Sequence, residues 1–161
     1  RLAEAGALDG LEILFGDDHV GVDIDHVQGC GDPFELVEWF HGGGTILNIG
    51  STAGIRPRPG LTWYNASKGA VNLLSKSMAV ELGPFGIRVN AICPVIGETA
   101  LLAQFMGVPD TPENRAKFIA TIPLGRLSQP KDVAQAAAFL ASDEAAFISG
   151  VEFPVDGART V

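Results

Sequence analysis

The stretch Thr45-Ile-Leu-Asn-Ile-Gly-Ser51 decides the fold, because it predicts a buried strand with a serine at its carboxyl end. A helix is expected from Trp63 to Leu82, where an apolar residue recurs every four positions and Gly83-Pro84 supplies a stop signal. A second strand is expected from Arg88 to Cys93. Strand, helix and strand in this order predict an α/β fold. The helical pattern consists of Ala66, Ala70, Leu74, Met78 and Leu82, with Leu73 alongside.

Three side chains around this strand and helix, Ser51, Tyr64 and Lys68, form a candidate catalytic set. Tyr64 and Lys68 are four residues apart in the first turns of the helix, so they share one face. Open α/β sheets bind ligands beyond the carboxyl ends of their strands, where Ser51 is expected. A phenol has an ordinary pKa of about 10, and a neighbouring cation favours its ionised form. We therefore expect Tyr64 to exchange a proton with a carbonyl oxygen that Ser51 polarises.

Each of these features also has an ordinary structural explanation. A tyrosine four residues before a lysine arises easily by chance, and a serine after a strand often serves only as a cap. The neighbouring motifs therefore have to decide between the two interpretations.

Several motifs in order resemble the short-chain dehydrogenase/reductase family. They are Ile46-Leu-Asn-Ile-Gly-Ser51, Tyr64-Asn-Ala-Ser-Lys68-Gly-Ala-Val, Ile87-Arg-Val-Asn-Ala-Ile-Cys-Pro94, Pro123-Leu-Gly-Arg-Leu-Ser-Gln-Pro130-Lys-Asp-Val-Ala134 and the ending from Phe139 to Gly157. The resemblance runs over residues 42–161 and implies a doubly wound, Rossmann-like α/β fold with a parallel sheet. We expect a single domain over residues 1–161, with 1–41 as a remnant of the dinucleotide-binding half and 42–161 as the catalytic and C-terminal half.

The resemblance also implies an activity, namely hydride transfer between NAD or NADP and a small-molecule alcohol or carbonyl substrate. In that family pattern Tyr64 is similar to the catalytic acid-base and Ser51 to the serine that orients the reacting oxygen. Lys68 is similar to the lysine that favours the tyrosinate and holds the nicotinamide ribose. The choice between NAD and NADP stays open, because the region that reads the adenosine ribose is not recognisable.

The segment that follows the second strand is similar to the part of the family that contacts the nicotinamide end of the cofactor. Pro94, Gly97 and Thr99 are the cofactor-binding candidates there, together with Tyr64 and Lys68. The chain departs from the family pattern at Val95, where glycine is usual, and at Gly97, where an aliphatic residue is usual. We therefore expect the backbone of this segment, more than its side chains, to bind the cofactor.

The C-terminal part is expected to supply a lid, a helix and a last strand. Residues 100–122 resemble the family's substrate-covering segment, and their apolar side chains either meet the substrate or pack the lid onto the body. Ser128, Pro130 and Asp132 predict the start of a helix that is capped by Ser128 and runs to about Ser142. Residues 151–155 predict a strand, and the resemblance implies a homo-oligomer.

The N-terminal part lacks a recognisable pyrophosphate turn. The possible strand Leu11 to Phe15 is followed by Gly16 to Gly21, which places Asp17 and Asp18 where a pyrophosphate would lie. Val22 to Ile24 distantly resembles the family's fourth strand, and no relay asparagine can be assigned. Two hypotheses stay open. Either the sequence is an incomplete record of a full oxidoreductase, or the chain is a non-catalytic remnant that retains a core and an oligomer surface.

Composition and charge limit the classes of partner. A net charge of −8 disfavours nucleic acid and anionic membranes. Two cysteines, Cys30 and Cys93, provide no disulfide framework, and no signal peptide or spanning segment is recognised, so a cytoplasmic location is expected. A metal site among the acids and histidines of residues 17–26 is not expected, because their spacing matches no recognised cage.

Overall fold

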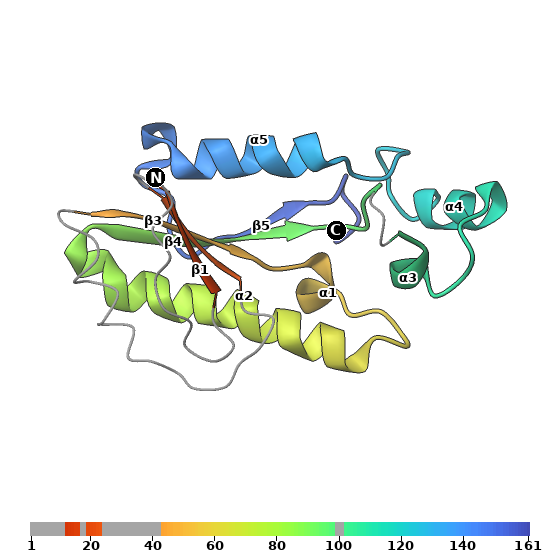
Figure 1. Ribbon diagram of the computed structural model, residues 1–161, viewed down its shortest axis with the longest axis horizontal. Helices are drawn as coiled ribbons and strands as arrows, with labels where there is room; N and C mark the ends of the chain where they lie inside the picture. Colours follow the sequence, from red (N-terminus) through yellow and green to blue (C-terminus); the bar gives the residue numbers. More distant parts are fainter. Residues whose placement is uncertain (1–11, 17–18, 24–42, 99–101) are drawn as a thin grey trace.

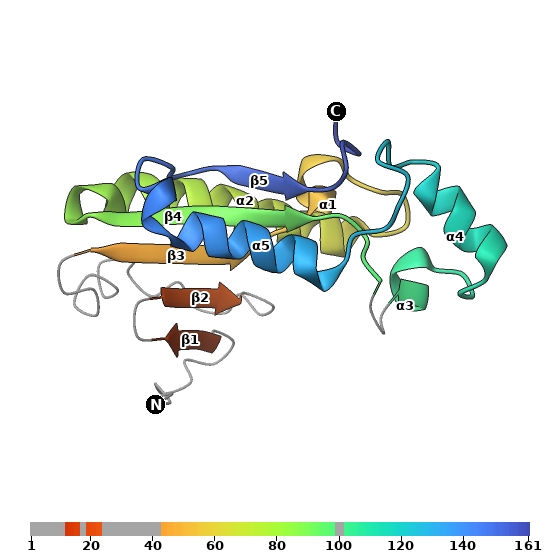
Figure 2. The same cartoon turned by 90° about the horizontal axis from the view of Figure 1, so that it is seen from above.

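A single sheet organises the computed structural model, which describes residues 12–16, 19–23, 43–98 and 102–161. Its strands lie in the order β1-β2-β3-β4-β5, and Figure 2 shows them side by side. The helix α5 covers one face of the sheet, while α1 and α2 lie on the other (Figure 1). This is the layered α/β arrangement that the sequence predicts.

The central strands are β3 (Gly44–Ile49) and β4 (Ile87–Pro94), which pair in parallel with Ile46 opposite Val89. The side chains of Ile46, Val89 and Ile92 are completely buried, because helices cover both faces of these strands. The strand β5 (Glu152–Val155) extends the parallel pairing on the far side of β4. The three strands predicted in this region are confirmed to within two residues.

The other side of the sheet differs from the expected parallel arrangement. The strand β2 (His19–Asp23) pairs in parallel with β3, whereas β1 (Glu12–Gly16) runs antiparallel to β2. Two residues separate β1 from β2. A parallel pair needs a crossover connection of about a dozen residues or more, so β1 cannot pair in parallel with β2, whereas the predicted parallel pairing is confirmed from β2 to β5. Residues 24–42, which contain Cys30, lie outside the described ranges.

The long helix α2 (Thr62–Leu82) is confirmed, but the apolar pattern that predicted it marks the buried face only in the second half of the helix, at Met78 and Leu82. Leu73 is 65% exposed, and Ala66 and Ala70 are exposed as well. A repeat of four drifts by about 40° per step around a helix with 3.6 residues per turn, so it cannot stay on one face. The residues that α2 does bury are Lys68, Val71, Asn72, Ser75, Met78, Ala79 and Leu82.

A short 3-10 turn, η2 (Gly83–Phe85), ends α2, and Gly86 then adopts a left-handed conformation with φ of 74°. A left-handed residue at this place favours glycine, because a side chain would clash with the backbone. The predicted stop signal is therefore confirmed. None of the helices in the described ranges is long and apolar enough to cross a bilayer.

The helix α5 (Pro130–Ala141) begins and ends on polar contacts. Its N-cap residue is Gln129, whose backbone N–H donates to the Asp132 carboxylate at 2.8 Å. The prediction that Ser128 caps this helix is wrong, because the Ser128 hydroxyl donates to the Val95 carbonyl at 3.3 Å instead. At the other end the Arg88 guanidinium donates to the carbonyl of Leu140 at 2.7 Å. A further turn, η3 (Asp143–Ala145), leads toward β5.

Candidate active site

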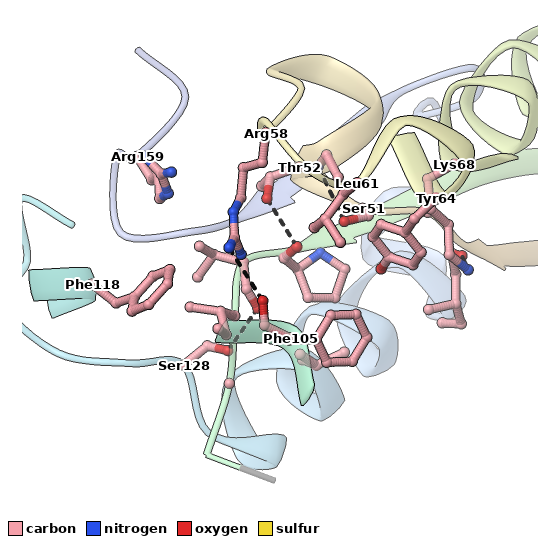
Figure 3. A pocket seen from close by; sticks show the side chains of 18 of the residues that line it. Ser51, Thr52, Arg58, Leu61, Tyr64, Lys68, Phe105, Phe118, Ser128 and Arg159 are labelled. Carbon is pink, nitrogen blue, oxygen red and sulfur yellow. Dashed lines mark hydrogen bonds between the residues drawn. The ribbon is translucent and has the colours of Figure 1, made fainter. Parts of the chain in front are cut away.

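A cavity of about 400 Å³ lies beyond the carboxyl ends of β3 and β4. Ser51, Tyr64, Lys68, Pro94 and Gly97 all line it, so the structure brings together five of the six residues that the sequence singled out. The sixth, Thr99, lies outside the described residues. Figure 3 shows Ser51, Tyr64 and Lys68 on one wall of this cavity.

Ser51 follows β3 directly and is the N-cap residue of α1 (Thr52–Ile55). Its hydroxyl oxygen accepts a hydrogen bond from the Ala53 N–H at 3.1 Å, and the side chain is 7% exposed. Within the described ranges, the Ser51 O–H donates to no protein acceptor. The structural and the chemical interpretation of Ser51 are therefore compatible, because capping uses the oxygen and leaves the hydroxyl proton for a ligand.

The approach of α1 to α2 sets the position of Ser51. A Cβ atom added at Gly54 would lie 2.7 Å from the backbone carbon of Lys68 and 2.8 Å from the nitrogen of Gly69. A side chain at this position would push the two helices apart. Sequence reasoning missed Gly54, because nothing local to α1 indicates which helix it meets.

Lys68 and Tyr64 are held by contacts with β3 and with the lid. The Lys68 Nζ donates to the Ile49 carbonyl at 3.1 Å and lies 6.0 Å from the centroid of the Tyr64 ring. The ring of Tyr64 meets Phe105 edge to face, with centroids 5.5 Å apart. An ammonium group has three protons, so Lys68 can serve more than one acceptor.

The surroundings of Val95 and Gly97, after β4, explain why these two positions depart from the family pattern. Val95 is 7% exposed and belongs to an apolar cluster beneath the lid. Gly97 forms a bridge with Ser128, and a Cβ atom at Gly97 would lie 2.9 Å from the Ser128 hydroxyl oxygen. Glycine is therefore required for close packing at this position, in keeping with a role for the backbone of this segment.

The predicted lid segment contains α3 (Leu102–Met106) and α4 (Pro112–Ile119), and its apolar residues differ in their surroundings. Leu102 and Met106 are buried in the cluster with Val95, so they pack the lid onto the body. Phe105 and Phe118 line the cavity, and Phe118 also packs against this cluster. The sequence did not separate these two groups, because neighbouring positions on short helices point in different directions.

Arg58 is a cavity residue that sequence reasoning missed. Its guanidinium donates to the Phe105 carbonyl at 3.2 Å and lies 4.9 Å from the centroid of the Phe118 ring. Burial lowers the pKa of Arg58, the charge of Arg159 lowers it further, and Tyr64 acts in the opposite direction. A charged residue in the irregular stretch 56–60 carries no sequence signal for a site, since most such residues are solvated.

The described residues also bear on metal binding and on the cofactor. No group of three or more His, Cys, Asp or Glu side chains in the described ranges is arranged to hold a metal ion. Ser51, Tyr64 and Lys68 offer hydroxyl and ammonium donors at the strand ends, beside the backbone of Pro94 to Gly97. This donor set fits the ribose and carboxamide of a nicotinamide, so the fold and site are those of an α/β protein with a ligand site beyond its strand ends.

Comparison with known proteins identifies the family. A family model described as enoyl-(acyl-carrier-protein) reductase matches residues 35–159. The 4-formylbenzenesulfonate dehydrogenase TsaC1/TsaC2 of Comamonas testosteroni is 53% identical over 120 residues, which are 74% of this chain and 48% of that protein. The chain belongs to the short-chain dehydrogenase/reductase family.

Solved structures agree with this family and with the Rossmann-like fold. A 3-ketoacyl-(acyl-carrier-protein) reductase from Brucella melitensis complexed with NADH is 50% identical, with a TM-score of 0.67 over 74% of this chain and 46% of that chain. A 7α-hydroxysteroid dehydrogenase complexed with NADH and 7-oxo glycochenodeoxycholic acid is 38% identical, with a TM-score of 0.69 over 78% of this chain and 47% of that chain. The chain therefore spans about half the length of the relatives that it matches.

Proposed function

We propose that the protein is an NAD(P)-dependent oxidoreductase that interconverts a small-molecule alcohol and its carbonyl compound. The observation that carries this proposal is the convergence of Ser51, Tyr64 and Lys68 on one cavity at the strand ends. The 53% identical relative is named as a dehydrogenase of an aldehyde, and this name supports a carbonyl substrate here.

In the direction of carbonyl reduction, bound NADH or NADPH supplies the hydride. Tyr64 donates its phenolic proton to the substrate oxygen, and the Ser51 hydroxyl donates a hydrogen bond to the same oxygen. The Lys68 ammonium lies 6.0 Å from the ring centroid, so a positive charge stands beside the side chain that gives up the proton. The Lys68 contact with the Ile49 carbonyl keeps this charge in place between the strand and the helix.

The test of this mechanism is to replace Tyr64 by phenylalanine. The Tyr64→Phe variant is expected to lose about a hundred- to ten-thousand-fold in kcat with either cofactor, because it lacks the acid but keeps the ring. Its circular dichroism and its Tm should match those of the wild type. Activity retained in Tyr64→Phe would remove the acid-base role.

Lys68 is tested against Lys76, which lies on the same helix and is paired with Glu152 at 2.7 Å. The Lys68→Met variant should weaken the binding of reduced cofactor as well as the rate, whereas Lys76→Met should leave both unchanged. Fluorescence titration with NADH and with NADPH measures the binding, and it also decides between the two cofactors.

A second candidate function rests on the N-terminal part, where no glycine-rich turn follows a strand in the sequence. In this alternative the chain is a non-catalytic module that keeps the fold and an oligomer surface. This alternative would be favoured if the protein unfolds cooperatively but neither NADH nor NADPH changes its fluorescence on titration.

We also propose a homo-oligomer and a cytoplasmic location. The resemblance to the family suggests the oligomer, and Phe147, whose side chain is fully exposed just before β5, is the residue at which we propose to test a subunit contact. The buried free thiol of Cys93 supports a reducing compartment. Fractionation of cells that express the tagged protein tests the location.

A further inference from the structure

The described charged side chains that line the cavity are all positive, although the chain as a whole has a negative net charge. The described lining includes Arg58, Lys68 and Arg159 and contains no aspartate or glutamate, whereas the net charge of the sequence is −8. Cations gathered at a concave, partly apolar site attract an anionic ligand, because the surrounding protein screens their field less than water does.

Arg58 differs from Arg115 and Arg126 in its partners. Arg115 is paired with Asp110, and Arg126 is paired with Asp132 at 2.6 Å. Among the residues that the structure describes, Arg58 has no carboxylate partner and is held by the Phe105 carbonyl and the Phe118 ring. A half-buried guanidinium without a counter-charge is poorly compensated, and a bound anion would compensate it.

Arg58 is also placed to meet a substrate at Tyr64. Figure 3 shows its side chain reaching across the cavity to the backbone of Phe105, whose ring contacts Tyr64 at a centroid distance of 5.5 Å. A ligand that contacts Phe105, Phe118 and Tyr64 therefore shares the cavity with the Arg58 guanidinium.

We propose that Arg58 selects substrates that carry an anionic substituent, a carboxylate or a sulfonate, on an apolar body next to the reacting alcohol or carbonyl group. The inference rests on the proposed function and specifies its substrate class. Arg58 binds the anion with charge-assisted hydrogen bonds, Arg159 adds a second positive charge, and Phe105 and Phe118 contact the apolar body.

The experiment compares three aldehydes with the same ring. The substrates 4-formylbenzoate and 4-formylbenzenesulfonate carry an anion, and methyl 4-formylbenzoate is neutral. In Arg58→Gln, kcat/KM for the anions is expected to fall about 10- to 100-fold relative to the neutral ester, since one charge-assisted contact is lost. Arg58→Lys keeps the positive charge but loses the planar pair of guanidinium donors. Its kcat/KM for the anionic substrates should therefore lie between that of Arg58→Gln and that of the wild type.

A matched control removes a positive charge from α4 without changing the lining of the cavity. Lys117 is exposed, adjoins Phe118 in sequence and does not line the cavity, so Lys117→Gln should keep the wild-type preference. The neutral ester serves as a second control, because a general loosening of the lid would lower its kcat/KM as much as that of the anions.

Binding of the unreactive anions benzoate and benzenesulfonate, followed by calorimetry in the presence of NADH or NADPH, tests Arg58 without turnover. Weaker binding in Arg58→Gln than in Lys117→Gln supports the inference, and equal binding or no binding overturns it. An unchanged anion preference in Arg58→Gln, or a loss of cofactor affinity in that variant, also overturns it. Failure of all three aldehydes to react counts against the proposed function alone, and calorimetry then decides the role of Arg58.

Discussion

Cys93, at the carboxyl end of β4, shows how burial changes the chemistry of a single residue. Its side chain is completely buried, and its thiol donates to the Asn72 side-chain oxygen at 3.5 Å. Burial raises the pKa of the Cys93 thiol to about 11, with a further contribution from the charge of Glu152. The neutral thiol is therefore the stable form in the folded protein.

We predict that Cys93 resists alkylation in the folded protein. At pH 8 only about one thiol in a thousand is ionised when its pKa is about 11, and thiolate is the reactive form. Iodoacetamide labelling, followed at the Cys93 peptide by mass spectrometry, should be slow in the native state and fast in denaturant. Rapid native labelling would contradict the buried position.

The same shift has a consequence for stability. A thiol whose pKa is raised on folding stabilises the fold fully below its unfolded pKa, and this contribution is lost as the pH rises toward 11. The Cys93→Ala variant has no thiol to ionise, so its free energy of unfolding should fall less between pH 8 and pH 10 than that of the wild type. The loss of packing in this variant lowers the free energy of unfolding at both pH values. Urea unfolding at pH 8 and pH 10 measures the difference.

At the scale of elements, α2 has a buried face that holds Lys68 and an exposed face that is partly apolar. Leu82 is completely buried at the end of the helix, whereas Leu73 is 65% exposed. Because both leucines lie on α2, replacing each by alanine compares a buried with an exposed position on the same helix.

Leu82→Ala is expected to lower the free energy of unfolding by about 2 to 5 kcal/mol, because it leaves a cavity in the core. Leu73→Ala should change the free energy of unfolding by no more than about 0.5 kcal/mol, since its side chain is already largely in water. Urea denaturation of both variants provides the comparison. An equal loss in Leu73→Ala would mean that another surface covers this face of α2.

At the scale of the whole molecule, the assembly state can be tested through Phe147. Light scattering at micromolar concentration is expected to give a multiple of the monomer mass, and Phe147→Asp should shift the protein toward monomer because a charge replaces the apolar contact. The exposed lysine variant Lys117→Gln serves as the control for a change of surface charge. A monomeric wild type would remove the proposal of a homo-oligomer.

The sequence predicted much of this fold because its strongest signals are local. Apolar, β-branched runs predicted β3 and β4, and helical spacing between a start and a glycine stop predicted α2. The same local logic failed where a partner decides the outcome. Ser128 carries a good capping side chain, but the Val95 carbonyl lies within its reach and Asp132 caps the helix instead.

The sequence by itself determined which residues form the central strands and the long helix, and it singled out Ser51, Tyr64 and Lys68 as the candidate catalytic set. Only the tertiary structure decided that β1 runs antiparallel, that Leu73 faces outward and that Arg58 enters the cavity with no carboxylate beside it in the described ranges. Backbone preference depends on neighbours in the sequence. Exposure and charge pairing depend on residues that meet only after the chain has folded.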